Sequence, residues 1–202
     1  MTTSRDLAIV ALDVPPDRAL EQGDLSLALA GAEVIDLVGA DALALDGDRI
    51  VPGSQRATGD RLLDAAAASL VRQEPYETVE DWLWRRGRDL FAAYVDDLER
   101  VGLVTRERGR RFPLRTGRTV PVDSPARSSA EQRRTSGEPV LAALAAAAGI
   151  DDKGPEFSED LIGEVITTVL AAVGDAVMEL EAVRQRRAIE SAAFDNVWRG
   201  GV

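Results

Sequence analysis

The sequence contains no cysteine and no histidine among its 202 residues. The lack of cysteine excludes disulfides and thiolate nucleophiles, and the lack of both residue types excludes the usual zinc sites and imidazole acid–base catalysis. Only carboxylates, hydroxyls and arginines remain for chemistry. We therefore expect no metal and no cofactor, and an enzyme is the least favoured class. The absence of cysteine also fits a cytoplasmic protein.

Aromatic residues and long apolar runs are scarce as well. Aromatics make up 4% of the chain, so alanine, leucine and valine must fill the core, which favours closely packed helices over a β-sandwich. No run approaches the roughly 18–20 apolar residues that cross a bilayer. No cleavage-site pattern follows the short apolar segment near the N-terminus. We expect neither a transmembrane helix nor a signal peptide.

Positive charge is sparse and unevenly placed. The net charge is −11, and Lys153 is the single lysine among 24 basic residues, a bias typical of GC-rich bacterial genomes. Residues 103–134 carry 9 basic and 3 acidic residues, whereas the segments on either side are acidic. The total argues against wholesale binding to nucleic acid or anionic membranes, but the basic island could make a local contact.

The stretch 57–83 predicts a helix–break–helix unit. Asp60 can cap the first helix with its carboxylate, and apolar residues then recur at helical spacing. Glu74-Pro75 stops this helix because the residue before a proline avoids the α region. Thr78 restarts it, with Asp81 three residues later as a capping box. Physical chemistry alone makes this unit scaffold.

The remaining elements follow from apolar periodicity and turn residues. Helices are predicted over 5–12, 24–37 (capped by Asp24), 89–101, 139–148 and 158–187 (capped by Ser158), with a last helical segment over 188–198. Two β-hairpins are predicted, 42–51 about Asp46-Gly47-Asp48 and 103–114 about Arg108-Gly109, and 116–136 reads as an exposed loop. The fold class is therefore mainly α, a single helical domain over residues 1–202 with two small peripheral β-hairpins.

Adjacent carboxylates at Asp96-Asp97 and Asp151-Asp152 raise the question of acid–base catalysis or a metal. Adjacent helical residues point in different directions, so Asp96 and Asp97 cannot converge on one substrate. We expect them on a solvated helix face.

Two clusters of arginine are candidates for anion binding. The first is Arg85, Arg86 and Arg88 beside Trp82 and Trp84. Arginine binds phosphate bidentately and tryptophan suits a membrane interface, so this cluster could cradle a headgroup. The alternative is a solvated helix end with one tryptophan in the core.

The second cluster lies in the second hairpin, whose turn carries Arg106, Arg108, Arg110 and Arg111. Near an anionic surface each basic residue contributes about 1 kcal/mol, so four could hold the protein weakly to a membrane. The alternative is a soluble hairpin whose arginines pair with the acidic helices.

An ordered series of motifs resembles the Golgi phosphoprotein 3 family, in its shorter bacterial branch. The resemblance is carried by residues 6–121 and is weak over 122–202. The motifs are LSLALAGAEVIDL at 25–37, the hairpin at 42–51, ATGDRLL at 57–63, ETVEDWL at 77–83, LERVGLV at 98–104, and the basic hairpin ending in Phe112-Pro113-Leu114.

The resemblance implies a helical, non-enzymatic protein. Eukaryotic members of the family are peripheral membrane adaptors that bind phosphatidylinositol 4-phosphate and retain glycosyltransferases by their cytoplasmic tails. For this chain it implies a cytoplasmic adaptor on the inner face of the plasma membrane. The partners expected from it are an anionic, phosphoinositide-like lipid or the membrane surface, and the cytoplasmic tails of membrane proteins.

The family's headgroup site uses a tryptophan and an arginine around the first buried helix, plus two basic residues three apart on a later helix. In this sequence the four positions fall on Glu21, Ala30, Arg88 and Phe91, so only Arg88 matches. The family's membrane-inserting hairpin corresponds to 106–114, where the arginines favour charge attraction over insertion. The candidate headgroup residues are Arg88, Arg85 and Trp84 together with Arg106, Arg108, Arg110 and Arg111.

Two other functions remain open. A helix followed by Gly102-Leu103-Val104 and a basic hairpin also resembles a winged-helix module that reads DNA, although the net charge and the acidic residues on the preceding helix oppose it. A protein-binding scaffold without lipid binding, oligomeric through the long C-terminal helix, is the other alternative.

Overall fold

The computed structural model describes residues 2–15, 18, 20–54, 56–107, 118–152 and 162–199, and of residues 106, 107, 118 and 192–199 it describes the backbone alone. Helices dominate these ranges, and two small antiparallel sheets accompany them. The predicted fold class, mainly α with two small β-hairpins, is therefore confirmed. None of the described helices is both long and apolar enough to cross a bilayer.

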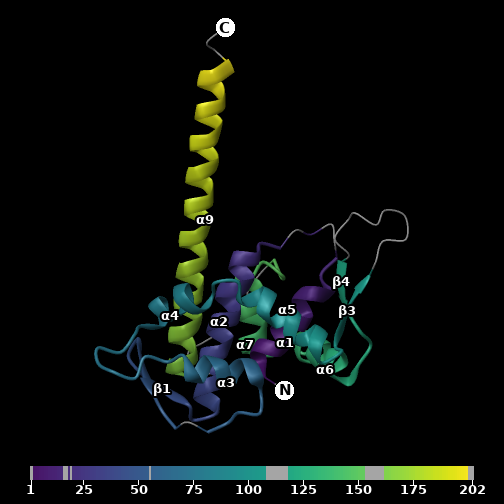
Figure 1. The fold of residues 1–202 in the computed structure, drawn as a ribbon, viewed down its shortest axis with the longest axis vertical. Coiled ribbons are helices and arrows are strands. Elements are labelled where there is room, and N and C mark those ends of the chain that lie inside the picture. Colours follow the sequence, from purple (N-terminus) through teal and green to yellow (C-terminus); the bar gives the residue numbers. More distant parts are fainter. Residues whose placement is uncertain are drawn as a thin grey trace.

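Helix α2 (Gln22–Gly39) is the element around which the others pack (Figure 1). It contacts α1 (Thr3–Asp13), α4 (Val79–Arg86), α5 (Leu90–Arg100), α7 (Pro139–Ala147) and α9 (Glu164–Arg199). Its alanines and leucines are buried on several sides, as a helix apolar all round must be. The helix begins earlier than predicted, because Glu21 occupies the N-cap and Asp24 lies in the first turn.

The predicted helix–break–helix unit is present as α3 (Arg61–Ala68) and α4. The Asp60 carboxylate caps α3 by accepting the N–H of Leu62 at 2.9 Å and that of Leu63 at 3.3 Å. Thr78 and Asp81 form the predicted capping box of α4. Both helix starts could be read from local sequence because each cap is made within three residues of the helix end.

The first hairpin is also as predicted. Strand β1 (Leu43–Asp46) pairs antiparallel with β2 (Arg49–Pro52), and Gly47 at the turn has a φ of 59°. A positive φ at this position is what a two-residue hairpin turn requires.

The second hairpin has a different partner strand from the predicted one. Strand β3 (Val104–Glu107) pairs with β4 (Arg118–Pro121), so that Arg106 lies opposite Thr119. The expected strand at 111–114 and the turn at Arg108-Gly109 lie outside the described residues. The composition of the turn predicted a partner strand closer in sequence to β3. The observed partner, β4, also packs against α1, and this tertiary contact favours the longer-range pairing.

The prediction of an exposed loop over 116–136 is wrong, because this range contains strand β4 and helix α6 (Pro125–Thr135). Ser124 caps α6 with Pro125 at the first helical position, a start signal that the serine- and arginine-rich composition obscured. Two ion pairs tie α6 to α1. Arg127 binds Asp13 at 2.7 Å, and Arg133 binds the buried Asp6.

The predicted helices at 158–187 and 188–198 form one continuous helix, α9. The Ser158 cap lies outside the described residues. The first half of α9 packs on α2, α4 and α7, with Val169, Val173 and Ala176 buried. Beyond Arg184 the side chains at 185–191 are all exposed, and Figure 1 shows this part of α9 projecting away from the other helices.

Close approach of α2 and α9 depends on Gly31, because a Cβ at this position would overlap Val173 of α9. We predict that Gly31→Ala lowers the free energy of unfolding by about 1–3 kcal/mol, the usual cost of overpacking a core. Urea denaturation followed by circular dichroism measures the change.

Gly174→Ala in α9 is the matched control, since a Cβ there meets nothing within 4 Å. Removing a glycine from a helix interior should raise stability by up to about 1 kcal/mol. Equal stability of the Gly31→Ala variant and the wild type would contradict the proposed packing of α2 on α9.

Candidate functional site

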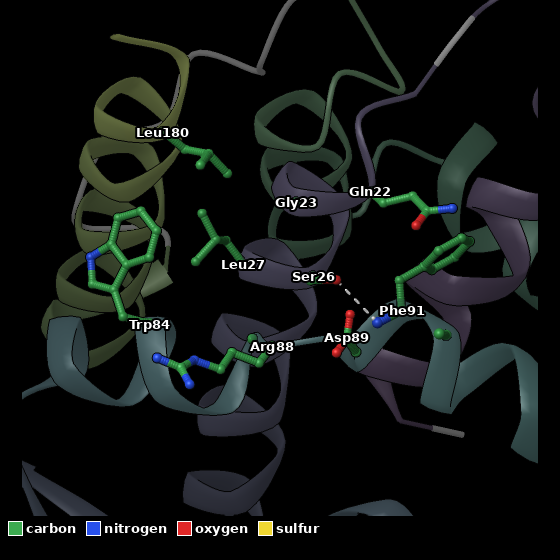
Figure 2. Close-up of a pocket in the computed structure, with 11 residues that line it drawn as sticks. Gln22, Gly23, Ser26, Leu27, Trp84, Arg88, Asp89, Phe91 and Leu180 are labelled. Atoms are coloured by element: carbon green, nitrogen blue, oxygen red, sulfur yellow. Dashed lines mark hydrogen bonds between the residues drawn. The ribbon is translucent and has the colours of Figure 1, made fainter. Parts of the chain in front are cut away.

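A cavity of about 240 Å³ opens between the first turns of α2, the corner that joins α4 to α5, and the middle of α9 (Figure 2). Its apolar wall comes from Leu27, Trp84, Phe91 and Leu180, and its polar groups are on Gln22, Ser26, Arg88 and Asp89. The two sequence-predicted residues Trp84 and Arg88 therefore share one pocket, contributed by adjacent elements.

The corner between α4 and α5 is short and tightly placed. Gly87 caps α4, and a Cβ there would overlap the carbonyl oxygen of Leu83. Asp89 has a φ of 54°, in the left-handed region that few residues other than glycine adopt. Because three residues make the turn, Arg88 and Asp89 both lie at the edge of the pocket.

Arg88 is exposed and forms no hydrogen bond or ion pair with any residue that the structure describes. Trp84, one turn earlier, is half-buried against the same cavity. Figure 2 shows the Arg88 side chain extending toward the side of the pocket where Trp84 lies. A guanidinium with free donors beside an apolar wall can bind an anionic group.

Arg85, the third residue predicted on this helix, points elsewhere. Its Nη2 lies 2.7 Å from Oε1 and 2.8 Å from Oε2 of Glu77, and its guanidinium carbon is 5.1 Å from the centroid of the Trp82 ring. Glu77 is almost fully buried. This ion pair ties α4 to the segment before it, so Arg85 has an internal partner and does not line the pocket.

Arg86 reaches into the core and binds Glu33 of α2. Its Nε and Nη2 donate to the two oxygens of Glu33 at 2.7 and 2.9 Å, and the Tyr94 hydroxyl donates to the same carboxylate at 3.2 Å. Burial raises the pKa of the Glu33 carboxyl despite the opposing effect of Arg86. Burial likewise raises the pKa of Tyr94 well above its ordinary value. The sequence analysis missed this group, although a lone glutamate within an apolar helix was a signal.

The other family positions do not complete a phosphate site. Glu21 is the N-cap of α2, and Ala30 is fully buried, its carbonyl accepting the indole N–H of Trp82 at 3.1 Å. Phe91 does line the pocket, as part of its apolar wall. Of the four positions, only Arg88 supplies a positive charge.

The second hairpin begins beside this pocket. A neighbouring cavity is lined by Thr119 of β4 and shares Gln22 and Phe91 with the first. Thr119 pairs with Arg106 across the hairpin. Arg108, Arg110 and Arg111 lie outside the described residues, so their positions relative to Arg88 stay predictions.

The expectation of a solvated face for Asp97 is wrong. This residue is 1% exposed, and its side chain binds Arg61 and Arg100, each at 2.8 Å, and Arg5 at 3.2 Å. Burial alone would raise its pKa, but the hydrogen bonds from Arg100 and Arg61 outweigh it and hold the pKa of Asp97 below its ordinary value. The group is a structural junction of α1, α3 and α5, formed by residues distant in sequence.

We predict that Asp97→Asn lowers the free energy of unfolding at pH 7 by about 1–3 kcal/mol, the usual effect of losing hydrogen bonds to a charged group. Because the folded-state pKa lies below the unfolded value near 3.9, the contribution is complete above that value and disappears as the pH falls through the folded pKa. The stability difference from wild type should therefore narrow below about pH 4. Asp96→Asn, at an exposed neighbour, is the control and should change stability by under 1 kcal/mol. A pH-independent deficit would contradict an ionic role for Asp97.

The geometry defines a mainly α-helical protein with a small, aromatic-walled surface pocket that offers one free arginine. The model of the Golgi phosphoprotein 3 (GPP34) family matches residues 4–189. The chain therefore belongs to this family, and the resemblance noted in the motifs is confirmed over nearly its whole length. A comparison with curated proteins found no match.

Proposed function

We propose that the protein is a non-enzymatic peripheral membrane adaptor that docks the phosphate of an anionic lipid headgroup at Arg88. The observation that carries the proposal is an exposed arginine that has no partner among the described residues, at the edge of an aromatic-walled pocket. Arg88 also occupies the one position that matches the family's headgroup site. A planar guanidinium binds two phosphate oxygens at once, which gives orientation as well as attraction.

The neighbouring arginines support this assignment by exclusion. Arg85 binds Glu77, Arg86 binds Glu33, and Arg184 of α9 binds Asp24 at 2.7 Å. Redirecting any of them to a ligand would leave a largely buried carboxylate without its partner, which is costly. Among these described arginines near the pocket, Arg88 is therefore the one that can engage a ligand without disturbing the fold.

Attraction to the membrane as a whole would come from the basic segment 106–118, which carries six arginines and one acidic residue. The base of this hairpin lines a cavity that adjoins the pocket, with Thr119 of β4 paired with Arg106, and residues 108–117 lie outside the described part of the chain. Trp84 suits the level of the lipid headgroups. In a bacterial cell the matching surface is the inner face of the plasma membrane, and the adaptor role adds the cytoplasmic tails of membrane proteins as partners.

Arg88→Ala tests the headgroup contact. We expect about tenfold weaker binding to vesicles of phosphatidylcholine with phosphatidylglycerol, because one charge-assisted contact of about 1.5–3 kcal/mol is lost. Co-sedimentation at low salt measures the change. Arg56→Ala removes the same charge at an exposed position outside the pocket and should bind like the wild type. Equal losses in the two variants, or equal pelleting on neutral and anionic vesicles, would sink the proposal.

The triple variant Arg108→Ala, Arg110→Ala, Arg111→Ala tests the basic segment. We expect it to reduce binding to every anionic vesicle by a similar factor, whatever the headgroup, and to weaken the salt dependence, because these charges act through the surface potential. Titration with sodium chloride between low and physiological salt measures both effects. An unchanged salt dependence would show that the segment does not contact the surface.

A further inference from the structure

The pocket edge carries two opposite charges that do not neutralise each other. Arg88 and Asp89 are consecutive and exposed, yet their side chains form no ion pair, and neither is bonded to another described residue. Figure 2 shows the Arg88 side chain extending toward Trp84, whereas the Asp89 carboxylate points away from the Arg88 guanidinium. A ligand in this pocket therefore meets a cation on one side and an anion on the other.

Capping of helix α5 does not explain why an aspartate occupies position 89. Asp89 occupies the N-cap position of α5, but its carboxylate makes no capping hydrogen bond. Ser26 of α2 caps the helix instead, because its Oγ accepts a hydrogen bond from the N–H of Phe91 at 3.2 Å. Asp89 thus adopts a positive φ, which aspartate tolerates better than most residues, without capping α5, and its carboxylate stays available at the pocket.

The charge balance disfavours a multiply phosphorylated headgroup. With Arg85, Arg86 and Arg184 committed to carboxylates, Arg88 and Asp89 are the charged residues that line the described pocket, and their charges cancel. A phosphomonoester carries nearly two negative charges at neutral pH. In this pocket such a group would be attracted by one arginine and repelled by one carboxylate.

The remaining lining suits a cation next to a phosphate. Phe91, two residues after Asp89, is a half-buried aromatic residue of the same pocket, and aromatic faces attract ammonium groups. A primary ammonium has three donors, which the Asp89 carboxylate and the Gln22 side-chain oxygen can accept. The cavity of about 240 Å³ is small, as a single headgroup requires.

We propose that this pocket binds a phosphodiester bearing a primary ammonium group, the chemistry of a phosphoethanolamine headgroup, with the phosphate on Arg88 and the ammonium on Asp89. The inference rests on the proposed function, because it names the ligand class of the same site. It also separates this chain from the phosphoinositide recognition expected of its family.

Vesicles of equal net charge test the assignment. Each contains the same fraction of phosphatidylglycerol and differs in the remainder, which is phosphatidylcholine alone or phosphatidylcholine with phosphatidylethanolamine. We expect wild-type protein to bind the ethanolamine vesicles about tenfold more tightly. Asp89→Asn should abolish this preference while the protein keeps its fold, since asparagine tolerates the positive φ. Glu80→Gln, at an exposed carboxylate on α4 outside the pocket, should keep the preference.

A third vesicle and a soluble probe separate the possible failures. If phosphatidylinositol 4-phosphate vesicles bind the wild type more tightly than ethanolamine vesicles, and Asp89→Asn strengthens that binding, the inference is overturned while the proposed function stands. If Arg88→Ala changes binding to none of the vesicles, the proposed function fails as well. Calorimetry with glycerophosphoethanolamine shows whether the ligand is a membrane lipid or a soluble molecule with the same headgroup. Asp89-dependent binding of this probe without any vesicle preference would support the ligand chemistry and assign it to a soluble metabolite.

Discussion

The buried carboxylate of Glu33 holds together the two helices that meet at the pocket. It accepts hydrogen bonds from Arg86, the last residue of α4, and from Tyr94 of α5, so α2 fixes both sides of the corner that carries Arg88 and Asp89. A buried ion pair contributes little net stability, but breaking it leaves an unpaired charge in the core. We interpret this network as the constraint that fixes the path of the chain at the site, and Gly31 as the residue that lets α9 close over α2 nearby.

The same core explains why one arginine of the cluster is available and the others are not. Arg85 and Arg86 each meet a buried or nearly buried carboxylate, whereas Arg88 follows the capping Gly87 and leaves the body of α4. Of these three arginines within four residues, two are therefore structural and one is a candidate ligand-binding residue. Arg88 occupies one of the three cationic positions that the resemblance assigns to headgroup binding, and the other two carry Ala30 and Phe91. This loss of positive charge is the basis for proposing a ligand with its own positive charge.

Local patterns predicted most helices, and distant contacts account for the misses. The caps at Asp60 and Thr78 and the turn at Gly47 act within a few residues, so the sequence alone located them. Helix α6 was missed because its serine- and arginine-rich composition obscured a local start signal, and the ion pairs that hold it to α1 join residues more than 100 positions apart. Trp84 and Arg88 could be expected to lie on one side of the chain because they are four residues apart, and they share the pocket. The availability of Asp89 could not be foreseen, since it depends on Ser26, 65 residues away from the Phe91 N–H that it caps.

The most direct measurement of ligand position is a nuclear magnetic resonance titration that follows the tryptophan indole N–H signals. Trp84 lines the pocket, whereas the Trp82 indole donates to Ala30 in the core and serves as an internal reference. The account predicts that glycerophosphoethanolamine shifts the Trp84 indole and the backbone amides of Gly87 and Asp89 and leaves the Trp82 indole unchanged. Saturable shifts confined to other parts of the molecule, with the Trp84 signal unmoved, would contradict it.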